Sequence, residues 1–392
     1  MLNCLSLSGI VLRYKNMKNV LKLLGWFLAS VVAGLMVGAL GVVIFTDTTL
    51  HEFYGNLISA NFLEVAGAAL TGMVATLAAI VILVVVHEAG HLVCGMATGY
   101  GFVSFRIFNL TFIRIDGKIK VKRFAVAGTG GQCLLTPPDL PVDQIPTACY
   151  NAGGVLANIV ALLIMAPLLL LDLHPVMSEV LVIFCVIDVV MILLNGLPMK
   201  LGGVGNDAYN MFYLRNNPLS KRALLDQLRS NALLQNGVRP GEMPDEWFEW
   251  KADVDYKNPL EVSIPMMFAS RCVDELDFET AYHKFEELYS HKADMIQLYV
   301  NEIACELAFC AMATGRRDRA ESLLDAKLMG YVEAYRSVMS SKQRLLCAKA
   351  LCIDNDPDGA QAIYKALESS KDKYLMQGEV RSDLAIMETI LR

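Results

Sequence analysis

Charged residues are scarce in this 392-residue chain, and one long stretch has none. No charged residue occurs between Leu70 and Val86, and over the whole chain 19% of residues are charged while 55% are hydrophobic. This composition excludes an ordinary soluble protein and indicates a membrane protein. The net charge of −6 arises entirely in the second half of the chain. An acidic tail does not suggest nucleic-acid binding.

Paired cysteine motifs are also missing. The ten cysteines are scattered along the chain, with no CxxC spacing and no cluster of the kind that binds a metal. Most of them fall in segments that we place in the membrane or the cytoplasm. Disulfide bonds are therefore not expected.

Four apolar stretches are long enough to cross the hydrocarbon core of a membrane, which takes about 20 residues. They are Leu23–Phe45, Ala68–Met96, Ala152–Leu171 and Val180–Pro198. The first follows a basic segment without acidic residues, and it is longer than the apolar part of a cleaved signal peptide. We therefore expect it to be a retained membrane anchor.

Lys and Arg are distributed unevenly among the connecting segments. Residues 46–69 and 172–179 contain none, whereas residues 99–148 contain six. The positive-inside rule then predicts that both termini and residues 99–148 are cytoplasmic. We expect a multi-pass membrane protein, located in the cell membrane if the source is bacterial.

The uncharged stretch runs directly into an HExxH motif, His87-Glu88-Ala89-Gly90-His91. Residues four apart share one face of a helix, so both imidazoles can reach a single metal ion. The neighbouring Glu88 carboxylate can accept a proton from metal-bound water. In a soluble helix the same motif is often only a surface pair of histidines. Within a membrane-length helix such groups are costly, so we interpret them as functional.

The sequence after this motif has the period of β-strands. Apolar and basic residues alternate between Phe102 and Phe124, and Asp116-Gly117 is typical of a two-residue hairpin turn. We expect a small cytoplasmic β-hairpin sheet. Its edge can pair with an extended substrate segment, and its basic face can meet anionic lipid headgroups. The glycines and prolines of residues 128–147 predict an irregular loop.

A catalytic zinc ion typically has three protein ligands and an open position for water. The candidates for the third ligand are Asp207, Asp188 and Cys94. Cys94 is two helical turns from His87, about 10 Å along the axis, which strains joint coordination. Spacing alone does not distinguish Asp188 from Asp207.

Three features together resemble the site-2 protease family of intramembrane zinc metalloproteases. They are the HExxH motif in a membrane helix, a helix that begins with small residues and carries Asn158, and Asn195-x-x-Pro198 followed by an aspartate. The resemblance covers about residues 68–210. It implies an enzyme that hydrolyses peptide bonds in or next to the transmembrane segment of a membrane-protein substrate.

The resemblance also implies a role for individual residues. The implied site consists of the zinc ligands His87, His91 and Asp207, the general base Glu88, and the substrate-binding residues Asn158 and Asn195. Spacing alone left Asp188 and Asp207 as candidates, and the resemblance favours Asp207 as the third ligand.

An internal repeat occupies the tail from about residue 264. Two alanines twelve residues apart recur after 39 or 40 residues, as Ala269/Ala281, Ala308/Ala320 and Ala348/Ala360. Gly315 and Asn355, each five residues before an alanine, are typical of a turn that ends a helix. The pattern resembles tetratricopeptide repeats with a longer period. We expect a cytoplasmic interaction module; a plain helical bundle is the alternative.

The predicted fold is mainly α and polytopic, with about four membrane helices and a small cytoplasmic β-hairpin sheet, followed by a cytoplasmic α-helical repeat domain. The predicted domains are an N-terminal segment with the first membrane helix (1–67), a metalloprotease core (68–210), a linker (211–263) and tetratricopeptide-like repeats (264–392). The expected partners are a membrane-protein substrate, a protein adaptor and membrane lipid. The alternative function is a membrane-anchored scaffold with an inert or structural metal site.

Overall fold

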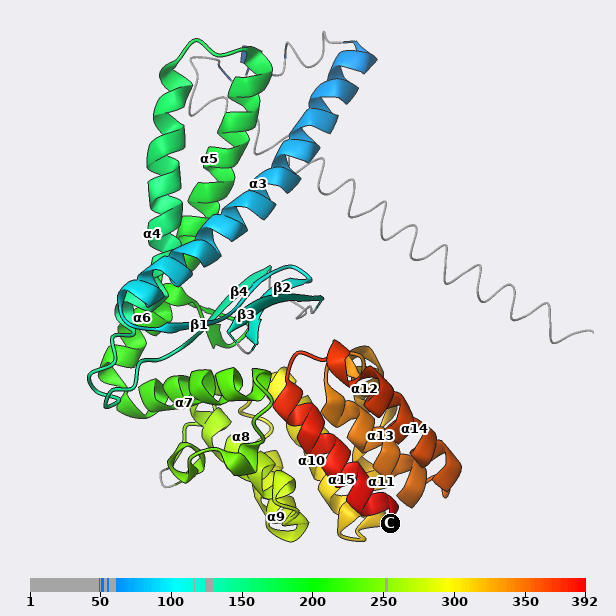
Figure 1. Ribbon diagram of the computed structural model, residues 1–392. Coiled ribbons are helices and arrows are strands. Elements are labelled where there is room, and N and C mark those ends of the chain that lie inside the picture. Colours follow the sequence, from blue (N-terminus) through cyan, green and yellow to red (C-terminus); the bar gives the residue numbers. More distant parts are fainter. Residues whose placement is uncertain are drawn as a thin grey trace, which may run out of the picture. The chain divides into compact units, whose positions relative to one another are not determined.

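The computed structural model describes residues 49, 51–52, 55, 61–115, 117–123, 130–250 and 253–392. Over these residues the chain is mainly helical, with thirteen α-helices and a small antiparallel sheet of four strands (Figure 1). The prediction of a mainly helical chain with a small sheet is thereby confirmed. The chain divides into two compact units, residues 1–87 with 155–194, and residues 88–154 with 195–392.

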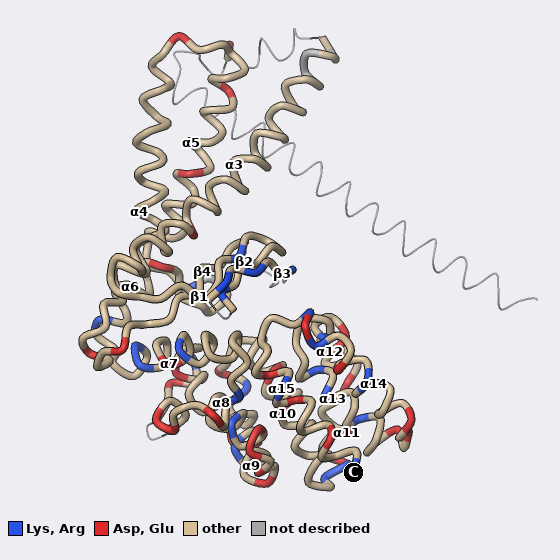
Figure 2. The backbone as a smooth tube through the Cα atoms, in the orientation of Figure 1, with Lys and Arg blue, Asp and Glu red and all other residues tan. Residues whose placement is uncertain are grey.

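The first unit is built from three apolar helices. They are α3 (Phe62–Ala97), α4 (Ala148–Met165, continued by a 3-10 turn over Ala166–Leu170) and α5 (Pro175–Gly196). Each is long and apolar enough to cross a membrane. The three helices correspond to three of the four membrane spans that the sequence predicts. The first expected span, Leu23–Phe45, and most of the connection that follows it lie outside the described residues. Few charged residues mark these helices in Figure 2.

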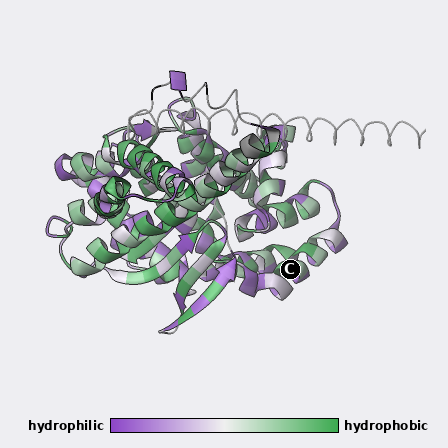
Figure 3. Ribbon diagram, turned by 90° about the horizontal axis from the view of Figure 1, so that it is seen from above, coloured by the Kyte–Doolittle hydropathy of each residue, from purple (hydrophilic) through white to green (hydrophobic). Residues whose placement is uncertain are grey.

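Many large apolar side chains of these helices are exposed. Leu77 is 59% exposed, Leu163 68% and Leu170 89%. Figure 3 colours the ribbon by hydropathy, and green, which marks hydrophobic residues, is widespread on its helices. Such a surface is unfavourable in water and favourable in lipid, because burial of apolar area is what stabilises it. The exposure pattern therefore fits helices that are surrounded by a membrane.

The second unit contains an antiparallel sheet with the strand order β3-β2-β1-β4. Its strands are β1 (Gly101–Ile107), β2 (Leu110–Ile115), β3 (Lys118–Arg123) and β4 (Gly131–Thr136). Ile115 pairs with Lys118, so two residues connect β2 to β3, and Gly117 has the positive φ of 74° that a tight hairpin turn needs. The expected hairpin is therefore present, although Asp116 itself lies outside the described residues.

Strand β4 corrects the prediction of an irregular loop over residues 128–147. Its residues pair with β1, for example Leu134 with Ser104 and Cys133 with Phe105. Cys133, Leu134 and Leu135 are buried, so this short apolar run is a core strand. The flanking glycines and prolines end the strand rather than extend a loop through it.

The segment 211–263, which we expected as a linker, is largely folded. It contains most of α6 (Asp207–Asn216), α7 (Pro218–Gln235) and 3-10 turns at Pro240–Glu242 and Asp245–Phe248. Leu225 and Leu228 of α7 are buried in one core with the sheet residue Leu135. Pro240 and Pro259 in this segment begin a 3-10 turn and helix α8, because a helix start does not need the N–H that proline lacks.

The repeat region consists of antiparallel helices. They are α8 (Pro259–Asp274), α9 (Phe278–Ser290), α10 (Gln297–Ala313), α11 (Arg317–Leu323), α12 (Ala326–Tyr335), α13 (Ser340–Cys352), α14 (Pro357–Ser370) and α15 (Gln377–Leu391), with a 3-10 turn at Lys371–Lys373. All six repeat alanines are at most 1% exposed. Only small side chains fit where the paired helices pack, which explains the alanine spacing.

The turns within the three repeats share one backbone conformation. Leu276, Gly315 and Asn355 have φ values of 66°, 75° and 52°, in the left-handed region. At the second turn the Arg316 N–H donates to the Ala311 carbonyl at 2.7 Å, which satisfies an end of helix α10. Residues at these three equivalent positions therefore end the first helix of each pair in the same way.

We expect Gly315→Ala to lower the free energy of unfolding by about 1 kcal/mol, because alanine in the left-handed region is strained. The matched control is Gly330→Ala. A Cβ added at either glycine meets nothing within 4 Å, but only Gly315 has a positive φ. The control in helix α12 should be neutral or stabilising. Thermal unfolding of the full-length variants in detergent measures the difference, and equal effects at the two positions would contradict the explanation.

Candidate metal centre

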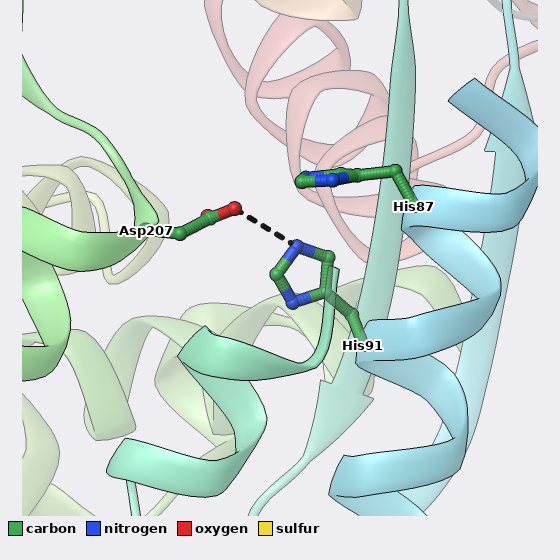
Figure 4. Close-up of side chains that lie close together, drawn as sticks. All are labelled: His87, His91 and Asp207. Carbon is green, nitrogen blue, oxygen red and sulfur yellow. Dashed lines mark ion pairs between the residues drawn. The ribbon is translucent and has the colours of Figure 1, made fainter. Parts of the chain in front are cut away.

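His87 and His91 lie one turn apart on α3, and each is 8% exposed. Together with Asp207 they form the group of potential metal ligands among the described residues, and their ligand atoms all lie within 4.8 Å of one another. Both imidazole rings project from α3 toward the Asp207 carboxylate (Figure 4). The arrangement offers two nitrogens and one oxygen from three side chains.

His91 is held by a backbone carbonyl. Its Nδ1 lies 2.8 Å from the carbonyl oxygen of Tyr150 in the first turn of α4. A carbonyl only accepts, so Nδ1 carries the proton and donates, and Nε2 is left with its lone pair. Nε2 lies 3.3 Å from Asp207 Oδ2. The lone pair of His91 is therefore directed to the place where the three side chains converge.

Close approach of α4 to α3 makes this bond possible. A Cβ added at Gly153 would lie 2.4 Å from the Gly90 carbonyl oxygen, so no larger residue fits there. Tyr150 is anchored from a second direction, because its hydroxyl donates to the Cys133 carbonyl at 2.9 Å. Two glycines and one tyrosine thus hold the carbonyl that orients His91.

His87 is held by a chain of side chains. Its Nδ1 lies 2.8 Å from Asn158 Oδ1, and Asn158 Nδ2 donates to Asp188 Oδ1 at 2.6 Å. Asn158 and Asp188 are both 0% exposed. Because the amide nitrogen serves Asp188, the amide oxygen accepts from His87 Nδ1, which leaves His87 Nε2 with its lone pair. Outer hydrogen bonds of this kind fix the ring and the tautomer of a metal-binding histidine.

Asp207 is placed by a hairpin and a helix cap. Strands β5 (Lys200–Leu201) and β6 (Val204–Gly205) are joined by two glycines with positive φ, 60° and 89°. Asn206 follows as the N-cap of α6; its Oδ1 accepts from the Tyr209 N–H at 2.9 Å, and its Nδ2 donates to the Leu197 carbonyl at 2.6 Å. Asp207 is then the first residue of α6, where a helix favours a negative charge.

The Glu88 carboxylate lies against the start of β4. A Cβ added at Gly131 would lie 2.5 Å from Glu88 Cγ and 2.5 Å from Glu88 Oε1. The buried Arg106 of β1 donates to the carbonyls of Phe108 at 2.9 Å and Gly131 at 3.3 Å. Burial lowers the pKa of Arg106, and the negative charge of Glu88 opposes that shift. Glu88 is thus placed beside a glycine and within the field of a buried cation.

One pair of ligand atoms in this group lies at the separation that a tetrahedral metal ion requires. Ligand atoms at about 2.1 Å from one ion, with tetrahedral angles, are about 3.4 Å apart. The 3.3 Å between His91 Nε2 and Asp207 Oδ2 matches that separation. Both histidines present Nε2, and the donor set of two imidazoles and a carboxylate suits zinc and other divalent transition metals.

The structure places the three candidates for the third ligand differently. Asp207 belongs to the group with both histidines, whereas Asp188 is hydrogen-bonded to Asn158, one residue further out. Cys94 is not in that group. Asn158 is fully buried and its amide contacts His87 and Asp188; its role as a substrate-binding residue stays a prediction. Asn195 lies partly exposed in the last turn of α5.

Sequence reasoning missed Arg106, Gly131 and Tyr150. Arg106 was counted only as one of six cations in a cytoplasmic segment, and Gly131 only as part of a loop. One signal was available for Arg106, since a charged residue at an inward position of a strand needs a partner. Comparisons of the chain with models of protein families, with curated proteins and with solved structures find no match.

Removing the Asn158 amide should weaken metal binding without removing a ligand. We expect Asn158→Ala to lower the affinity for Zn²⁺ about 10- to 100-fold, since His87 loses the bond that orients it. Asp188→Ala should have a similar or smaller effect, whereas Asp207→Ala should nearly abolish binding.

Competition with a chromophoric chelator measures the affinity of each purified variant. Asn151→Ala is the matched control, because Asn151 is a buried amide on the same helix that donates to the Thr147 carbonyl. Equal losses for Asn151→Ala and Asn158→Ala would contradict the role of the amide. A greater loss for Asp188→Ala than for Asp207→Ala would reverse the assignment of the ligand.

Proposed function

We propose that this chain is an intramembrane zinc metalloendopeptidase that hydrolyses peptide bonds in or next to the transmembrane segment of membrane proteins. One observation carries the proposal. The two imidazoles of a membrane-length apolar helix converge with Asp207, and a carboxylate stands next to the first of them. Ionisable groups at such a position are costly unless they have a function.

Zinc is the metal that we propose. The donor set supplies three protein ligands, which leaves a fourth position of a tetrahedral ion for water. When bound, zinc lowers the pKa of coordinated water to about 7 and polarises a carbonyl oxygen. Elemental analysis of the purified chain distinguishes zinc from iron, which also binds to two histidines and a carboxylate.

Glu88 is the proposed general base. It is next to His87 in sequence, so its carboxylate reaches the neighbourhood of the three ligands without belonging to them. It accepts the proton of the attacking water and passes it to the leaving amine. Arg106 and Gly131 act as positioning residues, because they border the Glu88 carboxylate and restrict where it points.

The sheet offers a place for an extended substrate. Peptide bonds in a helix are poor substrates, because their carbonyls are engaged in backbone hydrogen bonds, so the substrate has to unwind. Strand β4 is at one edge of the sheet, and Gly131 at its start adjoins Glu88. Pairing of an unwound segment along this edge would offset the hydrogen bonds that the segment loses.

The membrane-anchored scaffold is the second candidate. It is favoured by the size of the helical repeat region, which occupies residues 259–391 with eight helices among those described. The two functions differ in what they require of Glu88. A scaffold does not depend on this carboxylate, whereas a peptidase does.

Glu88→Gln is the decisive variant. We expect it to lower the rate of cleavage about 10²- to 10⁴-fold, as the loss of a general base does. The metal content should stay near that of the unaltered chain, because glutamine keeps the shape of the side chain and the ligands are intact. The measurement reconstitutes the purified chain with a panel of single-span membrane proteins and detects fragments by mass spectrometry.

The control for this experiment is Glu179→Gln. Glu179 is another carboxylate of a membrane helix, on α5 beside Gly72, and it is not among the metal ligands. The Glu179→Gln variant should cleave the substrates at the same rate as the unaltered chain. Cleavage by Glu88→Gln at the rate of the unaltered chain would refute the peptidase, and a chain that never cleaves and holds no metal would favour the scaffold.

Gly131→Ala tests the position of the Glu88 carboxylate. The added methyl group overlaps Glu88, so we expect cleavage to fall about 10- to 100-fold while the zinc content is unchanged. Gly67→Ala in α3 is the matched control, because its Cβ meets nothing within 4 Å. A variant at Gly131 that loses its metal, or one that cleaves normally, would show that this contact does not position the base.

A further inference from the structure

A cavity of about 440 Å³ lies within the second unit, between helices of the repeat region and α7. Its volume is in the range of ordinary ligand sites and exceeds that of a single side chain. The apolar part of its wall is rich in methionine and includes Met243, Met266, Met267, Met339, Phe248 and Phe285. Flexible methionine side chains adapt to apolar groups of different shape.

The polar part of the wall is acidic. Glu302 and Glu306 come from α10, and Glu379 and Asp383 from α15. Arg344 is the cation among the lining residues, and Lys342, which is not among them, donates to Glu302, so negative charge is in excess. The cavity wall therefore attracts a positively charged group.

The two cations are already engaged. Lys342 is 0% exposed and donates to Glu302 at 2.8 Å. Arg344 donates to Glu306 at 2.5 Å, and its Nε lies 3.3 Å from Asp383. Each cation thus serves the carboxylates next to it, and neither is left over for Glu379.

Glu379 and Ser230 are two polar side chains of the wall that a ligand can contact. Glu379 is partly exposed and lines the cavity beside three other carboxylates, and no hydrogen bond or ion pair holds its side chain among the residues that the structure describes. The hydroxyl of Ser230 on α7 is buried, with its residue 6% exposed, and it has no hydrogen-bond partner. A buried polar group without a partner is costly, and a ligand that contacts the Ser230 hydroxyl removes that cost.

We propose that this cavity binds a short apolar peptide segment that carries a lysine or arginine side chain, with the cation placed against Glu379. The methionine-lined part receives the apolar side chains of the segment. Segments that flank the membrane spans of proteins on the cytoplasmic side are rich in Lys and Arg. If the proposed function holds, the flanking segment of the substrate is such a ligand; the binding itself does not depend on cleavage.

The protonation of Glu379 gives the binding a pH dependence. Burial, together with the charges of Asp383 and Glu302, raises the pKa of Glu379 to about 8, against the opposing effect of Lys342. Glu306 adds to the increase. The acid is therefore mostly protonated at neutral pH. A cation favours its ionised form, so affinity should rise as the pH rises through about 8, where lysine is still charged.

The experiment compares three short fluorescein-labelled peptides that share the same apolar residues and differ at two positions, which hold Lys, Gln or Glu. Their binding to the full-length chain in neutral detergent is measured by fluorescence anisotropy. We expect the lysine peptide to bind about tenfold more tightly than the glutamine peptide, and the glutamate peptide most weakly. The preference for lysine should increase between about pH 6 and about pH 9.

Glu379→Gln should remove the preference for lysine over glutamine and its increase with pH. Glu368→Gln is the matched control, since Glu368 is an exposed carboxylate on α14 that does not line the cavity. The Glu368→Gln variant changes the net charge by the same amount as Glu379→Gln, and it should still bind the lysine peptide more tightly than the glutamine peptide. Equal binding of the lysine and glutamate peptides, or a full preference in Glu379→Gln, would overturn the proposal.

A free amine tests whether a peptide is needed. Butylammonium should displace the lysine peptide only at far higher concentration than an unlabelled copy of the peptide, because it leaves the apolar wall uncovered. Displacement at equal concentration would overturn the peptide as ligand in favour of a small cation. None of these measurements depends on substrate cleavage. A chain that binds the lysine peptide normally but cleaves no membrane protein would refute only the proposed peptidase function. A chain that cleaves membrane proteins but does not bind the lysine peptide would refute only this inference.

Discussion

Every polar side chain inside an apolar helix bundle needs a partner, and this requirement shapes the first unit. His87, Asn158 and Asp188 are buried among helices that are long and apolar enough to cross a membrane. They are linked to one another, through hydrogen bonds of 2.8 Å and 2.6 Å. A polar side chain without a partner costs several kcal/mol in an apolar environment. These hydrogen bonds therefore favour one register of the three helices that contribute the residues.

The second unit meets the same requirement differently. Around the cavity, carboxylates outnumber cations, and Arg344 is shared between Glu306 and Asp383. A fully paired cluster would be rigid and closed to ligands. Here the surplus is kept at Glu379, next to space that a ligand can occupy. Incomplete compensation in a cavity is a physical basis for recognition, whereas the linked hydrogen bonds from His87 through Asn158 to Asp188 are a basis for rigidity.

Local patterns predicted local structure well. The face shared by His87 and His91 follows from a spacing of four residues, and the buried repeat alanines follow from a spacing of twelve. Asp207 and Asp188 were inseparable by spacing, because the choice depends on a hairpin with two left-handed glycines and on the cap formed by Asn206.

Contacts between segments that are far apart in the sequence could not be predicted from local patterns. The contact of Asn158 with His87 depends on the register of α4 on α3, which no local pattern contains. Strand β4 was hidden because its apolar run is short and bounded by glycine and proline. The role of Gly131 follows only when β4 is placed against Glu88. In each case the missing information is the distance between two elements.

The turn at Leu276 has a consequence for the repeat region. Glycine and asparagine occupy the equivalent positions of the other two repeats, and both tolerate a positive φ, whereas leucine does not. The Leu276 side chain is also 43% exposed, so little packing compensates for the strain. The α8–α9 turn is accordingly the least favourable of the three turns, and partial opening of the repeat region would begin there.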